Sequence, residues 1–339
     1  MVTTRASNDL NLRTTSKVYL SAIFFLTTCF LAPFDPVTAQ NAATGSAAST
    51  ATSPALTAAL SSFPAHRVYD TKRRRIVDFE TMTARLAQAD LVFLGEQHND
   101  PRTHQLQAAV LEGVSRRRTG PIILALEMFE RDVQGTLDAY LAGTTPESTF
   151  LATSRPWPNY PTDYRPMVEF AKANWWPVVA GNVPRRYASQ VARRGLAAVD
   201  SLPPVERAFV ARDLSCPRDA YWERFKGVMG DMSGHGTPMS AEQVEAMVWR
   251  TYEAQCIKDE TMGEAVAAAH LAAGALVIHA NGSFHSDYRL GTVDRAQRRA
   301  PKARTMVVSF VPVTDLDTAL SRDQRKLGDF VVFTLAPAR

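Results

Sequence analysis

The chain contains 339 residues, of which 45% are hydrophobic and 21% are charged, and its formal net charge is +4. This composition is typical of a globular protein, and the length suits one large α/β domain with an insertion or two small domains. No basic block with interleaved aromatic residues occurs, so nucleic acid is not an expected partner.

Residues 1–39 have the pattern of a secretory signal peptide. Basic residues precede an apolar stretch over 18–32, and small residues at 37–39 form a cleavage site before Gln40. The apolar stretch is short for a membrane span, and an uncleaved N-terminal anchor that holds the protein at a membrane is the alternative. Residues 40–62 are rich in Ala, Thr and Ser and form a flexible linker. We therefore expect an exported protein, periplasmic or associated with the outer membrane.

The cysteines give information about lipidation and about the redox state of the compartment in which the protein resides. Thr28 precedes Cys29 where a lipidated cysteine normally follows Gly or Ala, so lipidation is not expected. Cys216 and Cys256 remain after cleavage, and an oxidising compartment permits them to pair. Pairing requires that their Cα atoms come close together. The sequence therefore leaves open a disulfide and two buried thiols.

From residue 63 onwards, strand patterns alternate with helix patterns. Unbroken apolar runs indicate strands buried on both faces, as in parallel sheets, and the β-α-β-α order places helices on those faces. Strands are predicted over 66–69, 75–77, 91–95, 122–126, 177–181, 275–281, 306–311 and 329–335. Helices are predicted over 79–88 (capped by Asp78), 102–117, 133–141, 164–173, 184–195, 218–232 and 240–272, the last opened by a Ser240–Gln243 capping box.

These elements predict an α/β fold with a largely parallel sheet flanked by helices. Residues 63–195 and 273–339 form the α/β domain, and residues 196–272 form a smaller helical insertion over the carboxyl ends of the strands. A rigid aromatic loop, Pro156–Pro161, interrupts the alternation. In an α/β sheet the ligand crevice lies beyond the carboxyl ends of the strands.

Two G-x-x-H motifs directly follow predicted strands. They end in His98 and His285, and carboxylates stand at two strand ends, Glu96 and Glu127. The glycine of each motif is expected to let the chain turn sharply off its strand. Two imidazoles and two carboxylates suit a divalent metal ion or a general acid–base pair. The alternative is that these side chains only cap helix N-termini and hydrogen-bond one another.

Other histidines are weaker candidates. His104 lies in the first turn of a predicted helix, as a pocket residue or a surface residue, and His279 sits inside an apolar strand, where a hydrogen-bonded core histidine is expected. His235 stands on a Gly-flanked tip over 233–238, where it could serve as an axial ligand. Tyrosines Tyr164, Tyr221 and Tyr288 have the reach to join a site.

Six segments carry a resemblance to a known family. They are Leu94–Asp100 with His104, Leu126–Arg131 with Gln134, Tyr164–Pro166, Asn182–Arg185, Ala254–Cys256 with Asp259 and Met262, and Gly282–His285. In this order, over roughly residues 64–335, the chain resembles the ChaN-type haem-binding lipoproteins. The wider superfamily includes the erythromycin esterases and the Tiki-type metalloproteases.

The resemblance implies haem binding outside the cytoplasm, with a tyrosine as the iron ligand. A homodimer in which two haems stack on each other is one arrangement that the resemblance implies. Tyr221 is the first choice of ligand because Trp222 and Phe225 could pack on the porphyrin, and Tyr164 is the second. Tyr288, His98, His104, His235 and His285 complete the candidate haem-binding residues. The Arg185/Arg186 pair could meet the propionates.

The sequence thus leaves two functions open. The first is an exported haem-binding protein that takes part in haem or iron uptake. The second is a metal-dependent hydrolase, in which Glu96, His98, Glu127 and His285 surround a divalent metal ion and its bound water.

Overall fold

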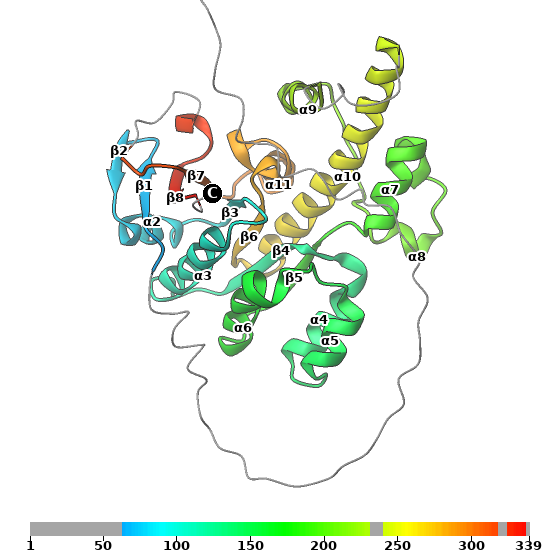
Figure 1. Ribbon diagram of the computed structural model, residues 1–339. Helices are drawn as coiled ribbons and strands as arrows, with labels where there is room; N and C mark the ends of the chain where they lie inside the picture. Colours follow the sequence, from blue (N-terminus) through cyan, green and yellow to red (C-terminus); the bar gives the residue numbers. More distant parts are fainter. Residues whose placement is uncertain (1–62, 231–239, 318–323, 337–339) are drawn as a thin grey trace, which may run out of the picture. The chain divides into compact units, whose positions relative to one another are not determined.

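The computed structural model describes residues 63–230, 240–317 and 324–336 (Figure 1). The predicted signal peptide, the linker and the tip that carries His235 lie outside these described residues. Within the described ranges, no helix combines the length and the apolar character needed to cross a membrane.

The described strands form one eight-stranded sheet. They are β1 (His66–Asp70), β2 (Arg75–Val77), β3 (Leu91–Glu96), β4 (Ile122–Glu130), β5 (Val178–Asn182), β6 (Leu276–Gly282), β7 (Thr305–Val313) and β8 (Phe330–Leu335). Their order is β2-β1-β8-β7-β3-β6-β4-β5. β1 pairs antiparallel with β2 and β8, and the other pairs are parallel. This topology confirms the predicted α/β class with a largely parallel sheet.

β3 and β6 lie side by side near the middle of the sheet, and every residue of both strands is buried. Their register places Glu96 opposite Gly282. The two G-x-x-H motifs therefore leave adjacent strands at the same level. β4 flanks β6 on its other side, with Leu126 opposite Ala280, so Glu127 lies one strand further along. We call this border of the sheet the carboxyl edge.

Helices cover both faces of the sheet (Figure 1). The described helices are α2 (Phe79–Leu86), α3 (Pro101–Ser115), α4 (Gln134–Leu141), α5 (Glu147–Ser154), α6 (Arg165–Ala173), α7 (Arg185–Arg194), α8 (Pro204–Arg207), α9 (Ala220–Gly230), α10 (Ala241–Ala273) and α11 (Thr292–Arg299). α2, α3 and α6 pack on one face, and α10 and α11 pack on the other.

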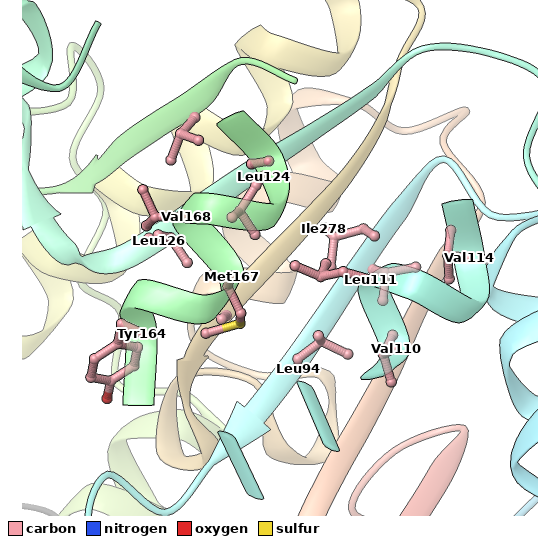
Figure 2. Close-up of a cluster of buried hydrophobic side chains, with 14 of the residues drawn as sticks. Leu94, Val110, Leu111, Val114, Leu124, Leu126, Tyr164, Met167, Val168 and Ile278 are labelled. Atoms are coloured by element: carbon pink, nitrogen blue, oxygen red, sulfur yellow. The ribbon is translucent and has the colours of Figure 1, made fainter. Parts of the chain in front are cut away.

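Alternate strand residues build the core on either side of the sheet. On the α3 and α6 face, Leu94, Leu126 and Ile278 pack against Val110 and Met167 (Figure 2). On the α10 and α11 face the core is formed by the strand residues next in sequence to these, such as Phe93, Ala125 and Val277. Successive side chains of a strand point to opposite faces of the sheet. Glu96 continues the row of Leu94 and therefore belongs to the α3 and α6 side of the carboxyl edge.

The predicted helical insertion contains the longest described helix, α10. The side chain of Ser240 accepts from the backbone N–H of Gln243, whose side chain accepts from the backbone N–H of Ser240, so the predicted capping box is present. Cys216 and Cys256 form a disulfide with their Cα atoms 5.8 Å apart. This bond joins the segment that precedes α9 to the middle of α10 and decides between the two alternatives that the sequence left open.

Three features differ from the sequence-based expectation. β4 continues beyond its expected end at Leu126 and includes Glu127 to Glu130. Its pairing with β5 shifts register between Leu126 and Glu130, so the strand resumes pairing after Glu127. α5 and α11 were not predicted. The aromatic loop runs into a π-helical turn over Tyr160–Tyr164, which brings Tyr164 to the start of α6. π-helical turns are rare and often accompany functional sites.

Candidate functional site

The structure brings four of the candidate side chains together at the carboxyl edge. The imidazole Nδ1 of His98 lies 2.9 Å from Oε1 of Glu96, and Nε2 of His285 lies 3.4 Å from Oε1 of Glu127. The backbone N–H of Gly282, at the end of β6, donates to Oε2 of Glu127 over 2.7 Å. The site therefore consists of two Glu–His pairs on either side of the end of β6.

Glu96 is the buried hydrogen-bond acceptor of the first pair. The Tyr164 hydroxyl donates to Oε1 over 2.5 Å, and the Gln107 amide donates to Oε2 over 2.9 Å. Burial by itself raises the pKa of Glu96, but the nearby His104 and the hydrogen bonds from His98 and Tyr164 outweigh it and lower that pKa. Glu96 is therefore a carboxylate at neutral pH.

His98 is the accessible member of this pair, with 21% of its side chain exposed. Burial lowers the pKa of His98, but the hydrogen bond to Glu96 and the charge of Glu127 outweigh burial. The pKa of His98 is therefore raised above its ordinary value. His104 is buried and its Nδ1 lies 3.0 Å from Oε1 of Gln107, which places it in the site rather than on the surface.

The second pair continues into a chain of buried groups. Nδ1 of His285 lies 2.8 Å from Oδ1 of Asp259 on α10, and Oδ2 of Asp259 accepts from the Tyr221 hydroxyl over 2.8 Å. Burial lowers the pKa of His285, but Glu127 and Asp259 outweigh it and raise that pKa to about 10. The pKa of Glu127 lies well below its ordinary value, because His285 and His98 outweigh the effect of burial. His285 is therefore an imidazolium between two carboxylates.

Gly282 lies where these two pairs meet, and its role differs from the one expected. Its φ of −56° is ordinary for any residue, so a sharp turn does not require glycine here. Instead, a Cβ at this position would lie 2.7 Å from both Cε1 and Nε2 of His98. The motif needs glycine because the imidazole of the other motif packs directly on its Cα.

The three candidate tyrosines have different surroundings. Tyr221 and Tyr164 are fully buried, and burial together with the neighbouring carboxylate raises the pKa of each phenol well above its ordinary value. Figure 2 shows the Tyr164 hydroxyl pointing away from the apolar cluster. Tyr288 is 36% exposed and has a positive φ of 61°. Tyr221, the first choice for an iron ligand, would have to break its hydrogen bond to Asp259 in order to ligate.

His279 and His235 complete the candidates. His279 is buried in the core, where its ring packs edge-on against Phe93, and burial lowers its pKa to about 4, so it is neutral at pH 7. His235 lies outside the described residues. Gln107, Gln255 and Asp259 are partners of the site residues to which sequence reasoning did not assign a role. For Gln107 the spacing of three residues from His104 on one helix was the available signal.

A pocket of about 530 Å³ includes Trp157 in its lining, and the Trp157 ring contacts His98 of the first Glu–His pair. We call it the Trp157 pocket; it is lined by Glu130, Arg155, Pro156, Trp157, Pro158, Arg185 and Arg186. The Trp157 ring centroid lies 4.8 Å from that of His98 and 5.8 Å from that of Tyr164, in both cases edge-to-face. The indole therefore belongs to the lining of the pocket and also contacts two side chains of the network around Glu96.

The expected divalent-metal site is not supported by this arrangement. Among the described residues, no group of three or more His, Cys, Asp and Glu side chains is arranged to hold a metal ion. The physical reason is that the carboxylates of Glu96 and Glu127 already accept hydrogen bonds from protein groups. In addition, His285 is held between Glu127 and Asp259.

The fold and the site define a class: α/β proteins with a largely parallel sheet and paired Glu–His motifs at its carboxyl edge. The sequence matches the family described as "Haem-binding uptake, Tiki superfamily, ChaN" over residues 82–296, and the chain belongs to this family. The match confirms the resemblance that the sequence segments indicated.

Solved structures resemble the chain to different degrees. One, described as cofacial haem binding to ChaN of Campylobacter jejuni, has a TM-score of 0.58 and 16% identity, covering 80% of this chain and 97% of that chain. Another, a mutant of the erythromycin esterase EreC in its open conformation, has a TM-score of 0.42 and 13% identity, covering 80% of this chain and 83% of that chain. No curated protein matches the chain.

Proposed function

We propose that this protein binds haem at the carboxyl edge of its sheet, with the porphyrin in the Trp157 pocket. The observation that carries the proposal is the pocket itself, whose lining combines an indole between two prolines with three arginines and Glu130. The indole contacts the partly exposed imidazole of His98. Its volume lies within the range of about 300–1,000 Å³ that ligand pockets occupy. Membership of a haem-binding uptake family supports the same assignment.

The donor set beside the pocket fits ferric haem. Haem needs a flat apolar surface for its ring and one axial donor for its iron. Trp157 supplies such a surface, and the imidazole of His98 and the phenol of Tyr164 both contact its ring. His98 is the accessible donor, whereas Tyr164 must first release its hydrogen bond to Glu96.

The Glu96 network positions these donors. Glu96 holds the Nδ1 side of His98 and fixes the ring, so a ligand would have to be met by Nε2, whose side of the ring packs on Gly282. Gln107 and His104 in turn fix the carboxylate of Glu96 from α3. Histidines that bind metals often hydrogen-bond a carboxylate through their other ring nitrogen. This bond sets the orientation of the ring and increases the basicity of the imidazole.

Export is the second part of the proposal. The Cys216–Cys256 disulfide supports it, because disulfides persist in oxidising compartments such as the periplasm. Haem held outside the cytoplasm suits a role in haem uptake, either in the periplasm or at the outer membrane. We also propose a homodimer that brings two haem sites together.

The experiment is a titration of the purified protein with haemin, recorded as visible spectra. We expect a stoichiometric complex whose spectrum changes in His98→Ala or Tyr164→Phe, and Tyr221→Phe, Tyr288→Phe and His235→Ala test the other candidate ligands in the same way. A wild-type protein that leaves the spectrum of free haemin unchanged would refute the proposal.

A second candidate function is hydrolysis by acid–base chemistry. The observation that favours it is the Glu96–His98 pair, in which a buried carboxylate orients a partly exposed imidazole of raised pKa, the arrangement of a general base. Ester hydrolysis that is lost in His98→Ala and insensitive to chelators would support it. Equal rates in wild type and His98→Ala would exclude it.

A further inference from the structure

The Trp157 pocket carries an unusual concentration of positive charge. Three guanidinium groups, those of Arg155, Arg185 and Arg186, line it together with a single carboxylate, Glu130. Arginines recognise carboxylates and phosphates through paired N–H donors. A pocket with an indole wall and three arginines therefore suits a flat apolar ligand that carries acidic groups.

Two of the three arginines are held in place by acidic side chains. Nη2 of Arg155 lies 2.6 Å from Oδ1 of Asp132 and 2.9 Å from Oε2 of Glu130. Nη1 of Arg186 lies 2.6 Å from Oδ2 of the same Asp132, and its Nη2 lies 2.9 Å from the Tyr187 hydroxyl. Asp132 thus bridges Arg155 and Arg186, and their charges are largely neutralised within the protein.

Arg185 differs from these two. No hydrogen bond or ion pair joins its side chain to another described residue, although it lines the same pocket. Like Arg186, it stands in the first turn of α7, where the helix dipole disfavours a cation. An unneutralised guanidinium at this place gains most from an anionic ligand, since its neighbours already have their acidic partners.

We infer that Arg185 binds a carboxylate of the ligand in the Trp157 pocket, which for haem is a propionate; this inference rests on the proposed function. The ligand's apolar body packs against Trp157, and Arg155 and Arg186 form a border whose charges are largely neutralised by their acidic partners. The ligand class is accordingly a planar tetrapyrrole with free carboxylates, and a tetrapyrrole whose carboxylates are esterified loses this contact.

The test compares two ligands and two variants. Dissociation constants for haemin and for its dimethyl ester are measured by tryptophan quenching, in the same detergent micelles, for wild type, Arg185→Gln and Arg193→Gln. Arg193 is the matched control, because it is an exposed arginine in the last turn of the same helix. Thermal unfolding of each variant verifies that the fold is retained.

We expect Arg185→Gln to weaken haemin binding about tenfold, as loss of one charge-assisted hydrogen-bonded contact predicts, and Arg193→Gln to have no effect. The dimethyl ester should bind wild type and Arg185→Gln equally. Equal haemin affinities in wild type and Arg185→Gln would overturn the inference and leave haem binding intact. A wild type that binds neither ligand would refute the proposed function and the inference together.

Discussion

Replacement of Gly282 by alanine tests whether the two Glu–His pairs are packed as the structure shows. The new Cβ would lie 2.7 Å from Cε1 and Nε2 of His98, which is 0.7 Å short of the 3.4 Å at which ordinary van der Waals contact begins. The imidazole of His98 does not move away easily, because Glu96 holds its Nδ1 at 2.9 Å on the far side of the ring. Overpacking of this kind costs about 1–3 kcal/mol.

We therefore expect Gly282→Ala to lower the free energy of unfolding in urea by about 2 kcal/mol. A displacement of the ring that breaks its hydrogen bond to Glu96 should also lower the pKa of His98, because that hydrogen bond is one of the causes that raise it. The imidazole pKa can be followed by NMR titration of the ring protons. His98 remains part of the proposed haem site, so haemin spectra of the variant should change as well.

The control is Gly227→Ala on α9. A Cβ at Gly227 meets no atom within 4 Å, and alanine is the better helix former by about 1 kcal/mol, so this variant should be as stable as wild type or slightly more stable. If Gly282→Ala unfolded at the same urea concentration as wild type, with an unchanged pKa of His98, the close packing of imidazole on glycine would be wrong.

Three further predictions concern the second Glu–His pair and the disulfide. Asp259→Asn should lower the pKa of His285 from about 10, because one of the two carboxylates that raise it is lost; an unchanged NMR titration of His285 would contradict this. The folded-state pKa of His285 exceeds its unfolded value of about 6.5, so its contribution to stability is complete below that pH and is lost as the pH rises through about 10. Urea unfolding of wild type should show this decline, and His285→Gln should show a smaller one. Reduction of the Cys216–Cys256 bond, which closes a loop of 40 residues, should cost about 4 kcal/mol by chain entropy; equal melting temperatures with and without reductant would refute it.

Much of the fold was predictable because its signals are local. Unbroken apolar runs mark the central strands, and polar residues mark where those strands end, so Glu96 and Glu127 were placed at one edge of the sheet. The capping box of Ser240 was likewise predictable, since its two partners lie three residues apart. The extension of β4 to Glu130 was not, because it depends on pairing with β5.

The site was predictable only in part. The sequence by itself determined that two G-x-x-H motifs follow buried strands, and parallel pairing then brings His98 and His285 to the same border. It could not determine that the glycine of the second motif is required by contact with the histidine of the first, because those residues lie far apart in the chain and meet only through the register of β3 and β6.

The tertiary structure alone decided which polar groups are neutralised inside the protein and which are left without such a partner among the described residues. The amphipathic pattern of α9 predicts a buried face but not its partner, and it is packing against α10 that places the Tyr221 hydroxyl on Asp259. The same holds for Arg185 and Arg186, which are adjacent in sequence and alike in chemistry. Only the position of Asp132 in space separates them, because an ion pair depends on distance and not on residue type.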